Sequence, residues 1–472
     1  MMHKNRVFAV IFAIIGLPAL MFAQDNNDVT EQSVSITVDQ AVAHALVYSS
    51  TLKTADIDLS MKERAGKYGW NVLLPTVNAT ATMARASDDA LESKGVPASM
   101  MTESLHWTGL AGISASWNLS LAYIEQIRAA KASYEAGKIT WEQSQRETKV
   151  NVQKLFYGLL LQQEALKLKK NTLENSRQRY VQADTNYRNG AVPEIRLLQL
   201  QVAYENLRPE VSKLEREFNN QIDTFAFLIG YPVGTKLELS GSINPEYVDV
   251  DYDKLMELYS RNSLDLRSLD KNIDVLKMNL MAINLASYTP ALALNYTYQP
   301  MLTDFLDADK GGFPGGDWKD MNGSFSLTLA WNLTNLLPFS SNRQTAADLR
   351  ANIDKLEVSR DMLLENQKIN VRKAVDTLND AKAQIDVMAR NITLAQRSYD
   401  MTARSYRNGT TELLDLRDAE DQLNQAQLGL ASQKFNYISA LLDLETALNT
   451  SLKPENKLES EKTETANAVK GE

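Results

Sequence analysis

Residue types that commonly carry out catalysis are scarce in this chain of 472 residues. It has no cysteine and only three histidines, His3, His44 and His106. Thiol nucleophiles, disulfides and zinc–thiolate sites are therefore excluded, and Ser-His-Asp triads or multi-histidine metal sites have little material. The glycines of Gly311–Gly316 follow no strand-to-helix pattern, so they do not predict a phosphate-binding loop. We expect no catalytic residue, no cofactor and no metal site.

One pair of carboxylates stands out by its spacing. Asp415 and Asp418 are three residues apart in a segment with helical periodicity, so both belong to one helix face. No other clustered acid–base pair is evident in the sequence. The plain alternative is a solvated surface pair whose charge is partly neutralised by Arg417. Whether this acidic pair has a function depends on the helices and strands that position it.

The chain starts with a segment typical of exported proteins. Lys4 and Arg6 precede an apolar run from Val7 to Ala23, which indicates a signal peptide over residues 1–23, with an uncleaved membrane anchor as the alternative. No other stretch is apolar and long enough for a membrane helix, which excludes an α-helical membrane protein. The net charge is −9 without a basic block, which disfavours nucleic acid as a partner.

The remaining chain reads as one unit written twice, at a spacing of roughly 215 residues. Three landmarks recur in the same order: Leu74-Pro75 as Thr289-Pro290, Trp117-Asn118-Leu119 as Trp331-Asn332-Leu333, and Tyr187-Arg188-Asn189-Gly190 as Tyr406-Arg407-Asn408-Gly409. We expect repeat 1 over residues 24–250, repeat 2 over 251–450, and a disordered tail over 451–472.

Each repeat is expected to hold a helix, two strands and a long helical hairpin. The first helix of repeat 1 is expected over 38–70. The strands are expected at 75–86 and 107–120, then at 290–300 and 323–335, and the hairpins at 121–229 and 342–449. Pro75 and Pro290 mark strand starts, where proline gives up no ladder donor. Gly190 and Gly409 end helices of roughly 100 Å, a length that implies a rod or tube.

The four strands alternate between apolar and polar residues. Val77, Ala79 and Met83 share one face of the first strand, whereas the other face carries uncharged threonine and asparagine. This pattern fits either half-buried strands of a soluble sandwich or transmembrane strands with lipid on one side. We favour the membrane interpretation because the polar faces lack charge and the chain offers no second layer. The aromatic girdle expected at the strand ends comprises Trp107, Trp117, Tyr296, Tyr298 and Trp331.

Four strands do not close a barrel. The smallest membrane barrels have about eight strands, and an open edge in lipid leaves backbone groups unpaired at several kcal/mol each. Other copies of the chain must supply the missing strands. The strand count therefore predicts an oligomer, with eight strands from two chains or twelve from three.

The ordered combination of signal peptide, helix–LP–strand–loop–strand–WNL–long helix–YxxG–helix units and absent cysteine resembles the TolC-like outer-membrane efflux proteins, the outer membrane factor family. The resemblance covers about 37–449. Departures include Thr289 in place of leucine before Pro290, Ser49-Ser50 and Asn262-Ser263 where the family often has Asn-Pro, and Ser340-Ser341-Asn342-Arg343 in place of Gly-Gly-x-Arg. We expect them to alter local turns only.

The resemblance implies a mainly α fold with a membrane β-barrel. Three chains of four strands each would form a twelve-stranded homotrimeric barrel in outer-membrane lipid, continued by a coiled-coil tunnel in the periplasm. The turns Tyr187–Gly190 and Tyr406–Gly409 would lie at the periplasmic tip and contact an adaptor (membrane fusion) protein, which links the duct to an inner-membrane transporter.

The resemblance also assigns a role to the acidic pair. Asp415 and Asp418 resemble in position two acidic residues that constrict the periplasmic entrance in this family. A trimer would place six carboxylates around one axis, which favours cations. Repeat 1 has Arg196 and Gln199 at the equivalent positions, so the turn itself does not demand the charges.

The sequence features fit an exit duct better than a scaffold or an enzyme. A passive exit duct of a tripartite efflux pump explains all the features, and the duct of a type I protein secretion system explains them equally. A periplasmic coiled-coil scaffold leaves the amphipathic strands without a purpose, and an enzyme lacks its residues. The sequence names neither the cargo nor the adaptor.

Overall fold

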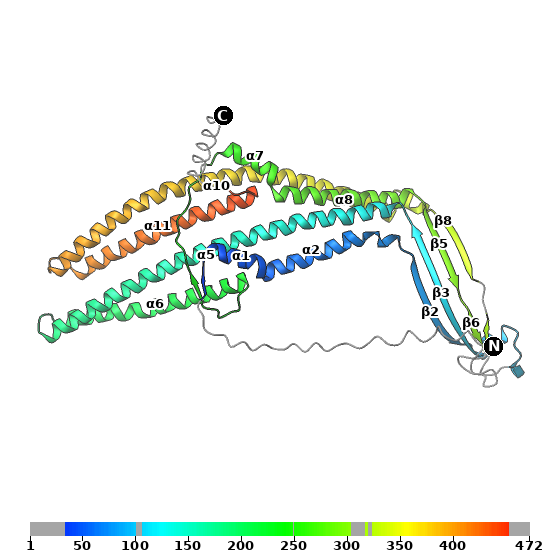
Figure 1. Ribbon diagram of the computed structural model, residues 1–472, viewed down its shortest axis with the longest axis horizontal. Helices are drawn as coiled ribbons and strands as arrows, with labels where there is room; N and C mark the ends of the chain where they lie inside the picture. Colours follow the sequence, from blue (N-terminus) through cyan, green and yellow to red (C-terminus); the bar gives the residue numbers. More distant parts are fainter. Residues whose placement is uncertain (1–33, 101–105, 249, 304–316, 320–322, 453–472) are drawn as a thin grey trace, which may run out of the picture.

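The computed structural model describes residues 34–100, 106–248, 250–303, 317–319 and 323–452. The predicted signal peptide and residues 453–472 of the predicted tail lie outside this part of the chain. The molecule is elongated, with long helices side by side, a β-sheet at one end and the turns of two helical hairpins at the other (Figure 1). It is mostly helical, which confirms the predicted class.

The helical part is built around two hairpins of equal size. Helix α5 (Ala122–Arg188) and helix α10 (Ser341–Arg407) each have 67 residues. Each turns back into a helix of 36 residues, α6 (Glu194–Ile229) and α11 (Leu413–Leu448). At 1.5 Å per residue the long helices reach about 100 Å. None of the helices in the described residues has an apolar stretch long enough to cross a membrane.

The helix that opens each half is divided in two, which differs from the single helix expected over 38–70. Helix α1 (Val38–Tyr48) gives way to α2 (Ser50–Tyr68), and α7 (Tyr252–Asn262) gives way to α8 (Leu264–Tyr288). The residues between them, Ser49 and Ser263, have ψ near 130° and 121°, outside the helical range. The Ser263 hydroxyl accepts the Leu266 N–H and starts the second helix. Both serines are buried.

The sheet contains the four predicted strands in the order β2–β3–β5–β8, all antiparallel. These are β2 (Thr76–Arg85), β3 (Trp107–Leu119), β5 (Ala291–Tyr298) and β8 (Ser324–Ala330). Two short strands extend it at the end far from the helices: β6 (Met301–Thr303) pairs with β3, and β7 (Asp317–Lys319) pairs with β6.

The last strand is shorter than the expected 323–335. It ends at Ala330, and the 3₁₀ turn η4 (Leu333–Leu336) follows. The Asn332 side chain accepts the Thr334 N–H at 3.1 Å and starts this turn. A side chain that satisfies local backbone thus ends the ladder before the alternating pattern does.

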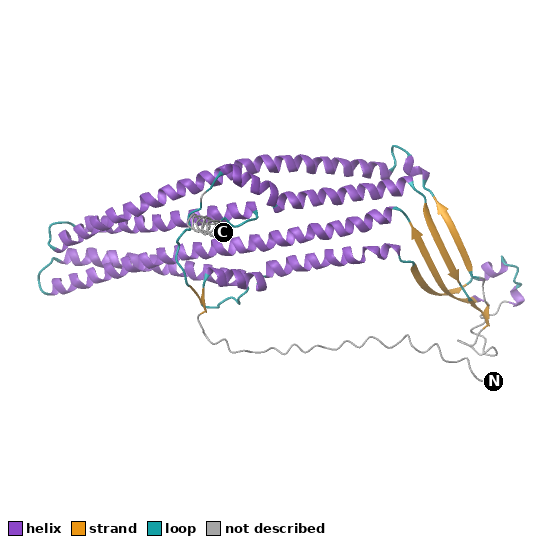
Figure 2. Ribbon diagram, turned by 45° about the horizontal axis from the view of Figure 1, so that its top comes forward, coloured by secondary structure: helices purple, strands orange, loops and turns teal. Residues whose placement is uncertain are grey.

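The register gives the sheet one apolar and one polar face. Directly paired residues share a face, and Val77 pairs with Ala115, which pairs with Tyr296, which pairs with Phe325. On the other face the pairs are Thr76 with Ser116, Ser116 with Asn295 and Asn295 with Ser326. Every residue of β2 and β8 is exposed. The strands stand beyond the ends of the helices (Figure 2).

The packed core lies midway along the helices, in two large clusters and a small third one of Val150, Ile438 and Leu442. The first joins α5 and α6 through Val152, Phe156, Phe225 and Ile229, and also includes the parallel strands β1 (Val34–Ile36) and β4 (Leu237–Leu239). The second joins α7, α10 and α11 through Tyr259, Val371, Leu378, Tyr437 and Leu448. Because the core is far from both ends, the sheet and the turns must be held by their own local contacts.

Candidate functional site: the hairpin tips

The turns of the two helical hairpins, between α5 and α6 and between α10 and α11, have the same backbone conformation. Gly190 and Gly409 have φ of +73° and +75°, the left-handed conformation that ends a helix. The next N–H reaches back into the last turn: Ala191 donates to the Asn186 carbonyl at 2.8 Å, and Thr410 donates to the Ser405 carbonyl at 3.0 Å. These bonds fix Tyr187 and Tyr406 in the last turn of each long helix.

The acidic pair lies in the first two turns of α11. Asp415 and Asp418 are both exposed. The Asp415 carboxylate accepts the backbone N–H of Glu412 at 3.4 Å, in a capping box at the start of the helix. Negative charge is favoured at a helix N-terminus, so local structure accounts for part of the role of Asp415. Asp418 has no such local contact among the described residues.

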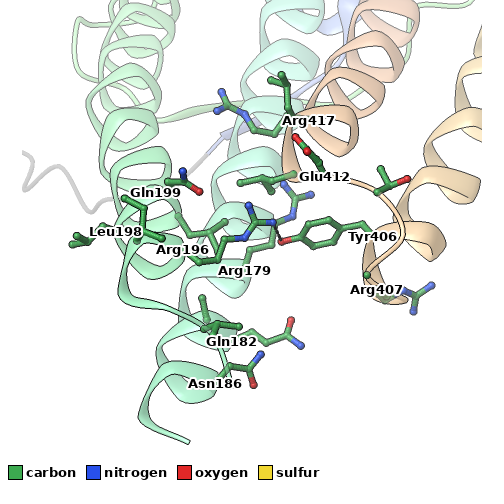
Figure 3. A pocket seen from close by; sticks show the side chains of 18 of the residues that line it. Arg179, Gln182, Asn186, Arg196, Leu198, Gln199, Tyr406, Arg407, Glu412 and Arg417 are labelled. Atoms are coloured by element: carbon green, nitrogen blue, oxygen red, sulfur yellow. Dashed lines mark hydrogen bonds between the residues drawn. The ribbon is translucent and has the colours of Figure 1, made fainter. Parts of the chain in front are cut away.

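A cleft of about 1260 Å³ separates the two hairpins near their tips (Figure 3). Its walls come from α5 and α6 on one side and from α10, α11 and the turn between them on the other. Exposed apolar side chains line it, namely Ile195, Leu198, Val202 and Leu414. Four arginines also line it, Arg179, Arg196, Arg407 and Arg417, against the single carboxylate Glu412. The cleft is therefore both apolar and basic.

One hydrogen bond crosses this cleft. The Arg196 guanidinium on α6 donates to the Tyr406 hydroxyl on α10 at 3.2 Å, and its carbon lies 5.7 Å from the centre of the tyrosine ring (Figure 3). Sequence reasoning singled out both residues, Arg196 as the counterpart of Asp415 and Tyr406 as a turn residue. It did not bring them together, because their contact depends on how two hairpins pack.

A buried charged cluster lies just above the cleft, and sequence reasoning missed it. Glu420 on α11 is only 5% exposed, and its carboxylate accepts bonds from Arg179 at 2.6 Å and Asn175 at 2.8 Å, both on α5. The signal was available, since Glu420 belongs to the same buried stripe as Leu416, Ala419 and Leu423. A glutamate within a buried stripe requires a partner.

The predicted girdle residues occupy three levels of the sheet. Trp107 begins β3 at the far end, Tyr296 and Tyr298 lie in the last part of β5, and Trp117 and Trp331 lie beside the helices. The last two donate their indole N–H inward, Trp117 to the Leu73 carbonyl at 2.5 Å and Trp331 to the Ser287 carbonyl at 3.3 Å.

The remaining sequence-selected residues have structural surroundings. Pro75 and Pro290 directly precede β2 and β5. His44 Nδ1 lies 2.7 Å from the Ile229 carbonyl, with its ring stacked on Tyr231. His106 contacts Asp88 at 2.7 Å. Within the described residues no three His, Cys, Asp or Glu side chains are grouped closely enough to hold a metal ion.

Comparison with known proteins places this architecture. The family model described as outer membrane efflux protein matches the chain twice, over residues 41–230 and 261–450. The probable efflux pump outer membrane protein TtgC of Pseudomonas putida is 21% identical over 435 residues, covering 87% of this chain and 82% of that protein.

Solved structures show the same fold. The Campylobacter jejuni CmeC outer membrane channel superposes with a TM-score of 0.70 at 18% identity, over 89% of this chain and 86% of that one. The open state of the Neisseria gonorrhoeae MtrE outer membrane channel gives 0.66 at 17% identity, over 88% and 89%. Because the family model spans most of both halves, the chain belongs to the outer membrane efflux protein family, and its place in the cell is the outer membrane.

Proposed function

We propose that this chain is the outer-membrane channel-tunnel of a tripartite efflux pump, a passive exit duct without a catalytic step of its own. The observation that carries the proposal is the two-faced sheet whose edge strands β2 and β8 are fully exposed. A face of Val, Leu, Phe and Tyr suits lipid, and a face of Ser, Thr and Asn suits a water-filled lumen.

The unpaired edges support a homotrimer. An edge strand in lipid is tolerated only if its backbone groups find partners. When β2 of one copy pairs with β8 of the next, three copies close a barrel of twelve main strands. The long helices then continue the same ring away from the membrane as a periplasmic tunnel about 100 Å long.

The tips are the proposed contact with the rest of the pump. The cleft between the hairpins offers exposed apolar side chains and arginines, a surface suited to an amphipathic helix. We assign it, with the turns at Tyr187–Gly190 and Tyr406–Gly409, to the periplasmic adaptor. The inner-membrane transporter behind the adaptor supplies the energy.

Asp415 and Asp418 are proposed as the gate at the periplasmic entrance. Both carboxylates are exposed in the single chain, so three copies arranged around an axis can present six of them to the lumen. A ring of carboxylates favours cations and narrows the opening.

Planar-bilayer recordings test both proposals separately. The purified wild-type protein is expected to form cation-selective channels, and the Asp415→Ala/Asp418→Ala variant channels that leak more and select less. Asp443→Ala, on the same helix far from the tip, is the matched control and should behave as wild type. Absence of channels from wild-type protein contradicts the duct. Unchanged conductance and selectivity in the double variant contradict only the gate.

A further inference from the structure

Glu420 is the one glutamate or aspartate that is buried among the described residues. Its carboxylate is held by Arg179, at 2.6 Å from Nη2, and by Asn175, at 2.8 Å from Nδ2. Arg179 is itself largely buried, with 16% of its side chain exposed. Removing one partner from such a pair leaves an uncompensated buried charge, which is strongly destabilising. The contact between α5 and α11 is therefore hard to break at this level.

We infer that Glu420, Arg179 and Asn175 form the pivot about which the hairpin tips move. The three side chains pin α11 to α5 and confine any movement to the part of each helix between them and the turns. This inference rests on the proposed gate, since it names the residue that positions Asp415 and Asp418.

The contacts on the two sides of Glu420 differ. On the side of Glu420 away from the tip, several further contacts join α5 and α11. Asn424 donates to the Thr172 hydroxyl at 3.1 Å, Asp443 pairs with Lys154, and Arg146 donates to the Glu445 carbonyl at 3.0 Å. Toward the tip, the Arg196–Tyr406 bond is the one hydrogen bond found between the hairpins within the described residues.

The cleft begins where these ties end. Arg179 lines both the cleft and the small pocket beside Glu420, so the buried cluster lies where these two spaces meet. Beyond it, α11 extends back only to Leu413 and α5 forward only to Arg188. At 1.5 Å per residue these terminal segments are about 10 and 14 Å long. Asp415 and Asp418 lie within the first of them.

The two gate residues thus lie on a short helix segment that is anchored to α5 at Glu420. Movement of the residues that line the cleft between the hairpins displaces Asp415 and Asp418. It does not disturb the contacts between α5 and α11 on the side of Glu420 that is away from the tip. If the contacts of Glu420 are lost, the movement extends along α5 and α11 away from the tip.

Spin-label distances test this, and the absence of native cysteine makes labelling clean. One label pair replaces Asn189 and Asn408 at the turns, and a second replaces Lys167 and Gln425 above the pivot; all four residues are exposed. In the otherwise unchanged full-length protein we expect a broad distance distribution at the turns and a narrow one above the pivot. In Glu420→Gln the distribution above the pivot should broaden.

Asp443→Asn is the control, because it removes another ion pair between the same two helices. It should leave both distributions unchanged. Asn175→Ala, which removes one hydrogen bond and keeps the ion pair, should broaden the upper distribution less and serves if Glu420→Gln does not fold. An unchanged upper distribution in the folded Glu420 or Asn175 variant overturns the pivot, as does equal broadening in Asp443→Asn. These distances do not depend on conductance, so a failed channel recording leaves this test intact.

Discussion

At the scale of single residues, the two tryptophans beside the helices have the same task in each half. Trp117 lies two residues before the end of β3, and Trp331 directly follows β8. Each donates its indole N–H to a backbone carbonyl 44 residues earlier in the chain. Their polar atoms therefore face the protein. This arrangement joins the sheet to the helices at two matched points.

Replacing either tryptophan by phenylalanine tests this joint. Trp117→Phe and Trp331→Phe keep a ring and remove the donor, so each should lower the free energy of unfolding by about 0.5–1.5 kcal/mol. Denaturant titration in detergent measures the change. Trp107→Phe is the control, because no indole hydrogen bond is found for Trp107 among the described residues. Equal losses at all three positions argue against the joint.

Tyr157 gives the protein a pH dependence in alkaline solution. Burial, followed by the charges of Asp39 and Glu246, raises the pKa of Tyr157 above its ordinary value of about 10. The unfolded chain then loses this proton at lower pH than the folded chain. The contribution of Tyr157 to stability is therefore complete below about pH 10 and is lost as pH rises through the folded pKa.

Tyr157→Phe should flatten the fall in stability above about pH 10. Unfolding midpoints measured across neutral and alkaline buffers check this, with tyrosinate absorption reporting ionisation. A profile as steep as that of the wild type contradicts the assignment.

Individual site residues were only partly predictable. Asp415 and Asp418 are visible in the sequence because their spacing is local. Arg196 and Tyr406 meet across 210 residues, and Glu420 meets Arg179 across 241. Such pairs follow from the packing of two hairpins, which no local pattern encodes.

At the scale of elements, the ends of the helices follow from glycine and proline. The long helices end within a residue or two of the expected positions, because Gly190 and Gly409 adopt a conformation that other residues avoid. The breaks at Ser49 and Ser263 were not foreseen. Serine carries no strong breaking signal, and these two interrupt their helices in buried surroundings.

Substituting these glycines should separate turn from helix. Nothing lies within 4 Å of a Cβ added at Gly190 or Gly409, so the cost of alanine there is conformational, about 1–2 kcal/mol. Gly409→Asn should cost less than Gly409→Ala, since asparagine tolerates the left-handed region.

Gly158 offers a control of opposite sign. It lies inside α5, where an added Cβ meets Phe435 at an ordinary 3.8 Å, so Gly158→Ala should stabilise by up to about 1 kcal/mol. Denaturant titrations of the three variants should therefore give changes of different sign. A stabilising Gly409→Ala contradicts the turn assignment.

At the scale of the whole molecule, the sheet of a single chain has two open edges. One face of the sheet is apolar and the other is polar across all four main strands. Within the described residues, the edge strands β2 and β8 have no pairing strand on their outer sides. The sequence predicts that strands are shared between copies of the chain, because four strands are too few to close a barrel. It did not reveal β6 and β7, whose short segments lie next to the long loops.

Disulfide crosslinking between copies tests the shared barrel. Val77→Cys on β2 is combined in turn with Phe325→Cys, Leu327→Cys or Leu329→Cys on β8, residues of the same apolar face. Since two thiols bridge only when their Cβ atoms lie about 3.5–4.5 Å apart, at least one combination should give covalent oligomers that stop at the trimer. Val77→Cys with Ser326→Cys is the matched control, because those side chains project from opposite faces and should not react. Within one chain β3 and β5 lie between β2 and β8, so every bridge formed joins two copies. A ladder that stops at the dimer, or bridging as efficient in the opposite-face control, would show that the strands do not close around a threefold axis.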